Sequence, residues 1–487
     1  MLENLDLEQE LTKEEYNRQL EALSQELGLV QRQAREAGRP VMLVFEGWRG
    51  ARRSRLINKM MQQLDSRGFK VHSSARIPVK QLAEGPFFTY FWQNLPAKGA
   101  MAVYHHSWYY LKNARDFGHL PKQVPAATFE QINSFEEALV KDNYIILKFF
   151  LHLSPKRQRK NLKGMQEELG PSWREVNPAY DESGSYGEYL EAYEKMLAAT
   201  DTAAAPWQLI AAEDLRLAQV QVFSSIIRLM KEHLSKEQTE PKLQPRPEAY
   251  NVLGRFEPYQ ALEKEEYKAR LEDYQQRLAQ LQLSMYKAGI GAVIGFEGWD
   301  AGGKGGAIRR LTASLDPLGY TVQSVAAPNA VERQYHYLWR FWQHLPKAGQ
   351  ISIFDRTWYG RVMVERIEGF AKAWEWQRAY EEIKEMEAQW ADHGLAIAKF
   401  WLQIDQEEQL RRFQERQQNP FKQWKITEED WRNREKWPAY EAAVNEMLMR
   451  TDTPQAPWTV VEGNNKYYAR LKVLQTVIDL FEHRLGL

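Results

Sequence analysis

A glycine-rich segment in the second half of the chain has the residue types and spacing of a phosphate-binding loop. The segment from Gly295 to Gly306 reads GFEGWDAGGKGG, and Gly298, Gly303 and Lys304 within it have Walker A spacing. Glycines let backbone N–H groups converge on phosphate oxygens, and a following helix adds its dipole. We therefore predict that Lys304 reaches the transferred phosphate above a cradle built from Gly298, Gly302, Gly303, Gly305 and Gly306.

Two aspartates near this loop predict a site for a hard cation. Gly305 stands after Lys304, where a Walker A loop usually has a Ser or Thr ligand for the metal, and Asp300 can supply the missing oxygen. Asp355 ends the apolar run Ile351–Asp355, a predicted strand, at the edge where open α/β sheets gather their active sites. Asp300 and Asp355 together predict a carboxylate site for Mg²⁺, with Mn²⁺ as the alternative.

Basic residues surround the predicted loop and metal site. Arg309 and Arg310 follow the loop, and Arg356 and Arg361 follow Asp355. A later segment carries five cations against the single acid Glu415, namely Arg411, Arg412, Arg416, Lys422 and Lys425. We predict that residues 405–440 form a mobile lid whose arginines contact phosphate. For any single arginine, a solvated helix face is the alternative.

The elements that position these residues occur twice. FEGWRGARRSRL at Phe45 matches FEGWDAGGKGGAI at Phe296, and TDTAAAPW at Thr200 matches TDTPQAPW at Thr451. Both pairs are 251 positions apart, so a whole domain is duplicated. The proline-rich stretch at 240–250 predicts the boundary, which gives domains 1–240 and 241–487.

Each half is predicted to be a three-layer α/β domain. A long helix (13–37 and 264–287) precedes a buried strand at Val41 or Ala292. In the second half, further strands are predicted from Thr321, Ile351, Ala396 and Trp458, with amphipathic helices between them. Alternation of strands and helices predicts a parallel sheet covered on both faces.

Composition limits the classes of partner and compartment. The 487 residues have 65 basic and 65 acidic side chains, so a polyanion site has to be a local cluster on a neutral body. No cysteine is present, which excludes thiolate chemistry. The acidic N-terminus lacks a signal pattern and no long apolar run occurs. We expect a cytoplasmic protein without nucleic-acid or membrane partners, and a homo-oligomer stays open.

These motifs resemble the polyphosphate kinase 2 family, and more narrowly its two-domain polyphosphate:AMP phosphotransferases. The matching pieces are EGWDAGGKGGAIRRL from Glu297, PNAVERQYHYLWRFWQHLPKAG from Pro328, FDRTWYGR from Phe354 and QLRRFQERQQNPFKQWK from Gln409. Thr357 and Asn419 are small departures, at positions where the family more often has Ser and Asp.

The resemblance implies a thymidylate-kinase-like fold with a helical lid, and Mg²⁺-dependent phosphoryl transfer from inorganic polyphosphate to AMP, giving ADP. It implies metal binding by Asp300 and Asp355 and phosphate contacts by Lys304, Arg356 and Arg361, with lid positions at Arg412 and Arg416. Single-domain members more often use nucleoside diphosphates, so a polyphosphate-dependent nucleoside diphosphate kinase is one alternative. An ATP-dependent small-molecule kinase and a non-catalytic polyphosphate-binding scaffold are the others.

The first half lacks the predicted chemistry. Asp300, Gly303 and Lys304 correspond to Arg49, Arg52 and Arg53. Asp355 and Arg356 correspond to His105 and His106. Both metal carboxylates are replaced by basic groups, so Mg²⁺ should not bind there. We predict an inactive first domain that serves as a pseudo-dimer partner or a polyanion platform.

Overall fold

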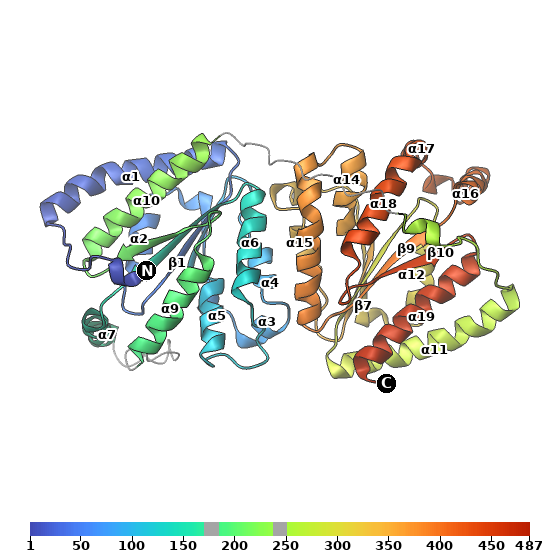
Figure 1. Ribbon diagram of the computed structural model, residues 1–487, viewed down its shortest axis with the longest axis horizontal. Helices are drawn as coiled ribbons and strands as arrows, with labels where there is room; N and C mark the ends of the chain where they lie inside the picture. Colours follow the sequence, from blue (N-terminus) through green and yellow to red (C-terminus); the bar gives the residue numbers. More distant parts are fainter. Residues whose placement is uncertain (170–184, 237–250) are drawn as a thin grey trace. The chain divides into compact units, whose positions relative to one another are not determined.

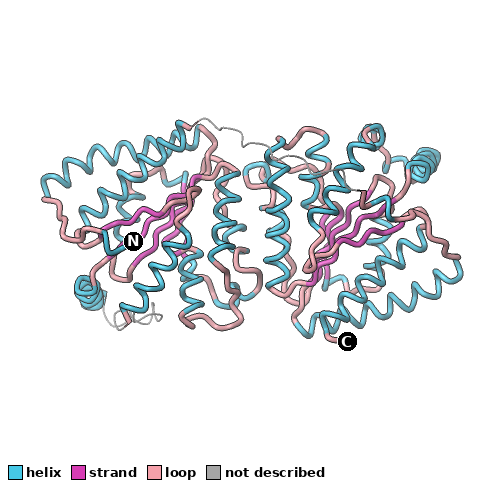
Figure 2. The backbone as a smooth tube through the Cα atoms, in the orientation of Figure 1, coloured by secondary structure: helices cyan, strands magenta, loops and turns pink. Residues whose placement is uncertain are grey.

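The computed structural model describes residues 1–169, 185–236 and 251–487. The predicted domain boundary at 240–250 lies outside the described residues. The described chain forms two compact units, one made chiefly of residues 1–239 and the other chiefly of residues 240–487. Figures 1 and 2 show in each unit a twisted sheet between helices.

The second unit is built on a five-stranded parallel sheet in the order β10-β9-β6-β8-β7. Its strands are β6 (Ala292–Gly298), β7 (Tyr320–Ser324), β8 (Ile351–Asp355), β9 (Ala396–Gln403) and β10 (Trp458–Glu462). The central strand β6 pairs with β8 on one side and with β9 on the other. The apolar runs of β6 and β9 are buried on both faces, as expected for central strands of a parallel sheet.

The first unit repeats this topology with the order β2-β3-β1-β4-β5. Its strands are β1 (Val41–Gly47), β2 (Phe69–Ser73), β3 (Met101–His106), β4 (Ile145–His152) and β5 (Trp207–Ala211). All of its pairings are parallel, and β1 is central as β6 is. The prediction of a duplicated α/β fold is therefore confirmed.

Helices cover both faces of each sheet. Those of the second unit are α11 (Lys264–Ala288), α12 (Lys304–Thr312), α13 (Trp339–Trp342), α14 (Val364–Ile367), α15 (Ala373–Asp392), α16 (Gln406–Gln418), α17 (Glu428–Glu435), α18 (Trp437–Thr451) and α19 (Lys466–Leu485). Those of the first unit are α1 (Lys13–Glu36), α2 (Arg53–Met61), α3 (Val79–Ala83), α4 (Thr89–Gln93), α5 (Trp108–Asp116), α6 (Phe129–Lys141), α7 (Pro155–Leu169), α9 (Tyr186–Thr200) and α10 (Leu215–Ser235).

The long first helix of each unit begins and ends where local signals place it. A capping box between Thr12 and Glu15 starts α1. Gly289, with φ of 69°, ends α11 in the left-handed conformation that glycine adopts without cost. Within the second unit, α11, α12 and α19 share one core on one face of the sheet, whereas α15 packs against β9 and α18 on the other.

A buried ion pair behind each sheet fixes the segment that follows the third strand in sequence. In the second unit, Lys399 on β9 donates to Glu387 on α15 at 2.8 Å and to the hydroxyl of Tyr359 at 2.8 Å. Both charged side chains are only 1% exposed. Burial lowers the pKa of Lys399, and the Glu387 carboxylate opposes that shift. Because Tyr359 follows β8 closely, the network positions the residues just after Asp355.

The described helices include none that is both long enough and apolar enough to span a membrane.

Candidate active site

The glycine-rich loop leaves β6 at the carboxyl edge of the sheet and leads into α12. Gly298 has φ of 150°, and a Cβ there would lie 2.7 Å from the carbonyl oxygen of Leu402 on β9. Gly303, with φ of 114°, is the residue before the first turn of α12. Any side chain at Gly298 would displace the backbone of β9, so these glycines shape the turn and direct the N-terminus of α12 toward the edge of the sheet.

Lys304 is the first residue of α12 and folds back over the loop. Its Nζ donates to the carbonyl oxygen of Gly298 at 2.6 Å and lies 3.4 Å from that of Trp299. The ammonium group is therefore at the mouth of the predicted cradle.

Asp300 lies between a cation and an amide donor. Its Oδ1 is 3.7 Å from Nη2 of Arg356, and its Oδ2 accepts a 2.9 Å hydrogen bond from Nδ2 of Asn433 on α17. The loop and the predicted lid thus meet at this carboxylate. Sequence reasoning missed Asn433, because 133 residues separate it from Asp300 and a single asparagine carries no spacing signal.

Asp355 and Arg356 are brought to the same edge by the pairing of β8 with β6. Asp355 ends β8 opposite Phe296, and the backbone N–H of Arg356 donates to the carbonyl oxygen of Phe296 at 3.0 Å. Arg356 has φ of 67°, a conformation that is uncommon outside glycine and turns its side chain toward the loop. Burial lowers the pKa of Arg356, but the neighbouring acids, Asp300, Glu297 and Asp355 among them, raise it by more, so the net shift is upward.

Glu297 is a buried carboxylate that holds the turn after β8. It accepts hydrogen bonds from the backbone N–H of Thr357 at 2.6 Å and from its hydroxyl at 2.8 Å. Burial raises its pKa, with Lys304 and Thr357 opposing the shift. The residue was absent from the predicted site, although its repetition as Glu46 in the other half was a signal for it. Glu46 accepts the corresponding bonds from Ser107 at 2.8 and 2.7 Å.

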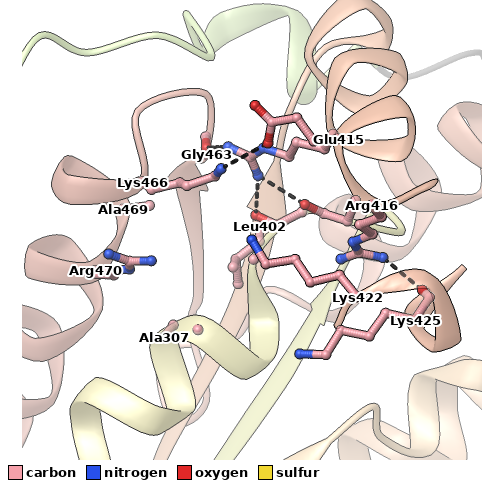
Figure 3. A pocket seen from close by; sticks show the side chains of 15 residues that line it. Ala307, Leu402, Glu415, Arg416, Lys422, Lys425, Gly463, Lys466, Ala469 and Arg470 are labelled. Carbon is pink, nitrogen blue, oxygen red and sulfur yellow. Dashed lines mark hydrogen bonds and ion pairs between the residues drawn. The ribbon is translucent and has the colours of Figure 1, made fainter. Parts of the chain in front are cut away.

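A cavity of about 200 Å³ opens beside the loop, and Figure 3 shows the side chains that surround it. Six cations line it against the single acid Glu415, and they are Arg412, Arg416, Lys422, Lys425, Lys466 and Arg470. Its floor is made by the loop and the first turn of α12, and includes Gly302, Gly303 and Gly306. Such a cavity suits a ligand with several negative charges.

Lys466 and Arg470 were missed by sequence reasoning. Both lie on the first turns of α19, which follows β10 at the same edge of the sheet as the loop. Burial and the neighbouring Arg412 lower the pKa of Lys466. A signal was available, because the positions 251 residues earlier hold Leu215 and Gln219. The two positions are therefore basic only in the half that has the phosphate-binding loop, and this difference between the repeats was the signal.

Arg412 is placed differently from the other basic residues of the lid. It is 4% exposed, and its guanidinium donates to the carbonyl oxygens of Ala301 at 2.9 Å, Gly302 at 3.1 Å and Gly463 at 2.6 Å. It also pairs with Glu408. These contacts assign it to positioning the loop, and its predicted phosphate contact stays a prediction.

The remaining predicted cations spread around the loop. Arg416 lines the cavity and donates to the carbonyl oxygen of Lys425 at 3.0 Å, while Arg309 is exposed on α12. Arg361 pairs with Glu365 at 3.2 Å. Gly305 faces open space, and a Cβ there would meet no atom within 4 Å. The structure therefore brings Lys304, Asp300, Asp355 and Arg356 to one edge, with the basic cavity beside it.

Basic side chains occupy the corresponding edge of the sheet in the first unit. Arg53, at the position of Lys304, lies 3.4 Å from Glu46 and 3.4 Å from Nε2 of His106. His105 contacts the hydroxyl of Ser54 at 2.9 Å. Burial, together with Arg53 and Arg76, lowers the pKa of His105 to about 3. His106 is shifted in the same direction by burial and by Arg53.

Two histidines of the first unit, one buried and one half-buried, predict acid sensitivity. His72 and His152 each have a pKa lowered to about 4 by burial. Since the unfolded state takes up these protons first, we expect the free energy of unfolding to fall as the pH drops from about 6.5 toward 4. The measurement is the thermal midpoint of the first unit against pH.

His152→Gln is a matched variant for this prediction. His152 accepts from Trp48 at 2.9 Å, and in the second unit Gln403 accepts from Trp299 at 2.9 Å. Glutamine should therefore keep the hydrogen bond and flatten the pH dependence. An unchanged slope in this variant, and in His72→Asn, would contradict the assignment.

The chain matches a family model twice. The model described as Polyphosphate kinase 2 covers residues 10–238 and 261–485. The polyphosphate:AMP phosphotransferase of Pseudomonas aeruginosa is 36% identical over 490 residues, which is 99% of each chain. That of Pseudomonas syringae pv. tomato is 37% identical over 454 residues, covering 92% of this chain and 91% of that protein.

A solved structure agrees with these sequence matches. It is a crystal structure of a polyphosphate kinase 2 from Pseudomonas aeruginosa PA01, 36% identical, with a TM-score of 0.87 over 100% of this chain and 99% of that one. Both halves, the loop and the strand order are thus accounted for by one family, and the chain belongs to the polyphosphate kinase 2 family.

Proposed function

We propose that this protein transfers the terminal phosphoryl group of inorganic polyphosphate to AMP, giving ADP and a polyphosphate one unit shorter. The observation that carries the proposal is the cavity lined by six cations beside the loop. A linear polyanion needs many positive charges along one path, whereas a single nucleotide needs fewer. The full-length relatives named polyphosphate:AMP phosphotransferase support AMP as the acceptor.

The reaction asks little of a general base. A phosphate oxygen of AMP, already ionised near neutral pH, attacks the terminal phosphorus of the donor. The bond from that phosphorus to the next bridging oxygen breaks, and the shortened chain leaves with the electron pair. Because two polyanions have to approach each other, the main task of the protein is to supply positive charge and position the reactants.

Asp300 and Asp355 are the residues that would hold Mg²⁺. They fit the ion because Mg²⁺ is commonly bound through one or two carboxylates, with waters and substrate phosphates completing its shell. No cluster of three or more His, Asp or Glu side chains suited to a metal occurs in the described parts of the chain, which agrees with a site completed by substrate. When bound, the ion would neutralise charge on the reacting phosphates.

The protein's own cations would do the rest. Lys304 is positioned to exchange its bond with the Gly298 carbonyl for a phosphate oxygen, which neutralises charge at the scissile bond. Arg356, held beside Asp300, would face the same phosphates. The lid segment from α16 to α17 carries Asn433 to Asp300, so its closure would exclude water that otherwise hydrolyses the donor.

The test compares donors and acceptors in one assay. The protein is incubated with Mg²⁺, AMP and either long-chain polyphosphate or ATP, and nucleotides are separated and quantified. We expect ADP from polyphosphate and AMP. Turnover with ATP but not with polyphosphate as the donor would instead indicate an ATP-dependent kinase. A preference for ADP or GDP over AMP as the acceptor would indicate a nucleoside diphosphate kinase.

Lys466 and Arg470 should bind the donor rather than the acceptor. Since both line the cavity and neither contacts Asp300, we expect Lys466→Ala/Arg470→Ala to raise the KM for polyphosphate by about tenfold or more with little change in the KM for AMP. Initial rates at varied donor and acceptor measure both constants. The matched control is Lys472→Ala, on the same helix but paired with Glu462 at 2.7 Å. A rise in the KM for AMP alone would place the acceptor in this cavity.

A further inference from the structure

Helix α7 of the first unit is strongly basic where its counterpart is neutral. It carries Lys156, Arg157, Arg159, Lys160 and Lys163 against Glu167 and Glu168. The counterpart α16 balances three arginines with Glu407, Glu408 and Glu415. At the repeat displacement these three acids become Lys156, Arg157 and Gly164. Of the three arginines, Arg411 corresponds to Lys160, whereas Arg412 and Arg416 correspond to Asn161 and Met165. The net positive charge of α7 therefore comes from its lack of these acids and from basic residues at positions where α16 has none.

The basic helix adjoins the former loop. Asn161 on α7 donates to the carbonyl oxygen of Gly50 at 3.0 Å, the contact that Arg412 makes with Ala301 in the other unit. A Cβ at Gly164 would lie 3.9 Å from Nη2 of Arg52. Arg52 stands where the second unit has the cradle glycine Gly303. The φ of Arg52 is 54°, a left-handed conformation that costs energy for any residue with a side chain. A cation is thus held beside α7 at some cost.

A further arginine approaches the same edge. Arg76 is exposed, and it is close enough to His105 to lower the pKa of that side chain together with Arg53. Arg53 is turned inward to Glu46, whereas Arg76 and Arg52 have no carboxylate at ion-pair distance among the described residues.

The outward cations of this surface are not neutralised by described neighbours. Lys156, Lys160 and Lys163 are exposed at i, i+4 and i+7, which places them along one face of α7. Within the described residues no carboxylate lies within ion-pair distance of these three lysines or of Arg52. Such a stripe repels itself and attracts a linear polyanion. Helix α7 has no aromatic residue, so the bases of a nucleic acid would find no stacking partner on it.

We propose that the first unit is a second, non-catalytic binding site for linear inorganic polyphosphate, formed by Arg52, Arg76, Lys156, Arg159, Lys160 and Lys163. The choice of polyphosphate rests on the proposed donor of the second unit. Because the first unit lacks both metal carboxylates, its site would hold a polyphosphate chain without cleaving it.

The test is a calorimetric titration of the full chain with a short linear polyphosphate in Mg²⁺ buffer. Wild type should show two sites per chain. Lys156→Ala/Lys160→Ala/Lys163→Ala should lose one of them, or weaken it by about tenfold, and should keep its kcat and its KM for AMP. The control Lys70→Ala/Lys122→Ala/Lys236→Ala removes the same charge from exposed positions at the start of β2 and beyond the ends of α5 and α10, and should keep both sites.

The outcomes separate this proposal from the function of the other unit. One site in wild type that the α7 variant leaves intact would overturn the second site while sparing the catalytic proposal. If Lys466→Ala/Arg470→Ala removes binding at the cavity of the second unit and keeps the α7 site, the result would support both the second site and the catalytic proposal. Equal weakening by the α7 and control triples, or tighter binding of a single-stranded oligonucleotide of equal charge at the α7 site, would overturn the assignment.

Discussion

Asp300→Asn and Asp355→Asn are each expected to lower kcat by about a hundredfold to a thousandfold, the scale seen when one preorganised electrostatic group is removed. Asparagine keeps the size and one oxygen of the side chain but removes the negative charge that would hold Mg²⁺. The first unit cannot compensate, because Arg49 and His105 stand at the corresponding positions. Initial rates of ADP formation over a range of Mg²⁺ concentrations measure the effect.

Two further measurements make this prediction specific. Binding of Mn²⁺, followed by electron paramagnetic resonance without any turnover, should weaken in both variants. His105→Asn, the matched change in the first unit, should leave kcat and Mn²⁺ binding unchanged. A near-wild-type rate for Asp355→Asn at saturating Mg²⁺, or residual activity that disappears only with a change in the first unit, would contradict the assignment.

Lys399→Met is expected to destabilise the second unit by about 3–5 kcal/mol, because it leaves the Glu387 carboxylate buried without its cation. The pair is completely enclosed, and Trp358 and Tyr359 both donate to the same carboxylate at 2.8 Å. Their displacement would also move the residues that follow Asp355, so kcat should fall with stability. Denaturant unfolding followed by tryptophan fluorescence measures the change.

The duplication provides the matched control. Lys148 bonds to Glu136 at 2.8 Å in the first unit, and both side chains are fully buried. Lys148→Met should destabilise the first unit by a similar amount without changing the kcat of a folded second unit. The double change Lys399→Met/Glu387→Leu should recover part of the loss, since the buried unpaired charge is gone. A cost below about 1 kcal/mol for Lys399→Met would show that aromatic packing alone holds this segment.

The two units show how a fold outlasts its chemistry. Three features recur in both units. They are the buried lysine network, the hydrogen bond from the tryptophan after the loop glycine to β4 or β9, and the glutamate that holds the turn after β3 or β8. These contacts lie within the layers and specify the packing. The residues that differ, such as Arg49 and His105, lie at the carboxyl edge of the sheet, where substitutions cost the core little.

Sequence alone determined the duplication, the strands and the loop. The hydrophobic periodicity and boundary residues of a helix or strand are visible in its own sequence. For this reason α1, α11 and β10 begin at the residues predicted for them. The loop and Asp355 could be assigned to one edge because parallel strands end together. Arg412 shows the limit of such reasoning, since spacing placed it on a lid helix but could not show that its guanidinium points at the loop carbonyls.

Only the tertiary structure decided which distant residues complete the site. Asn433 reaches Asp300, Lys466 and Arg470 close the cavity, and Glu297 holds Thr357, although none of these pairs is near in sequence. The physical reason is that a side chain's neighbours depend on the direction in which it leaves its element and on how the elements are stacked. Local spacing fixes the element and the face, whereas the contacts across the edge of the sheet arise only after strands far apart in the chain have paired.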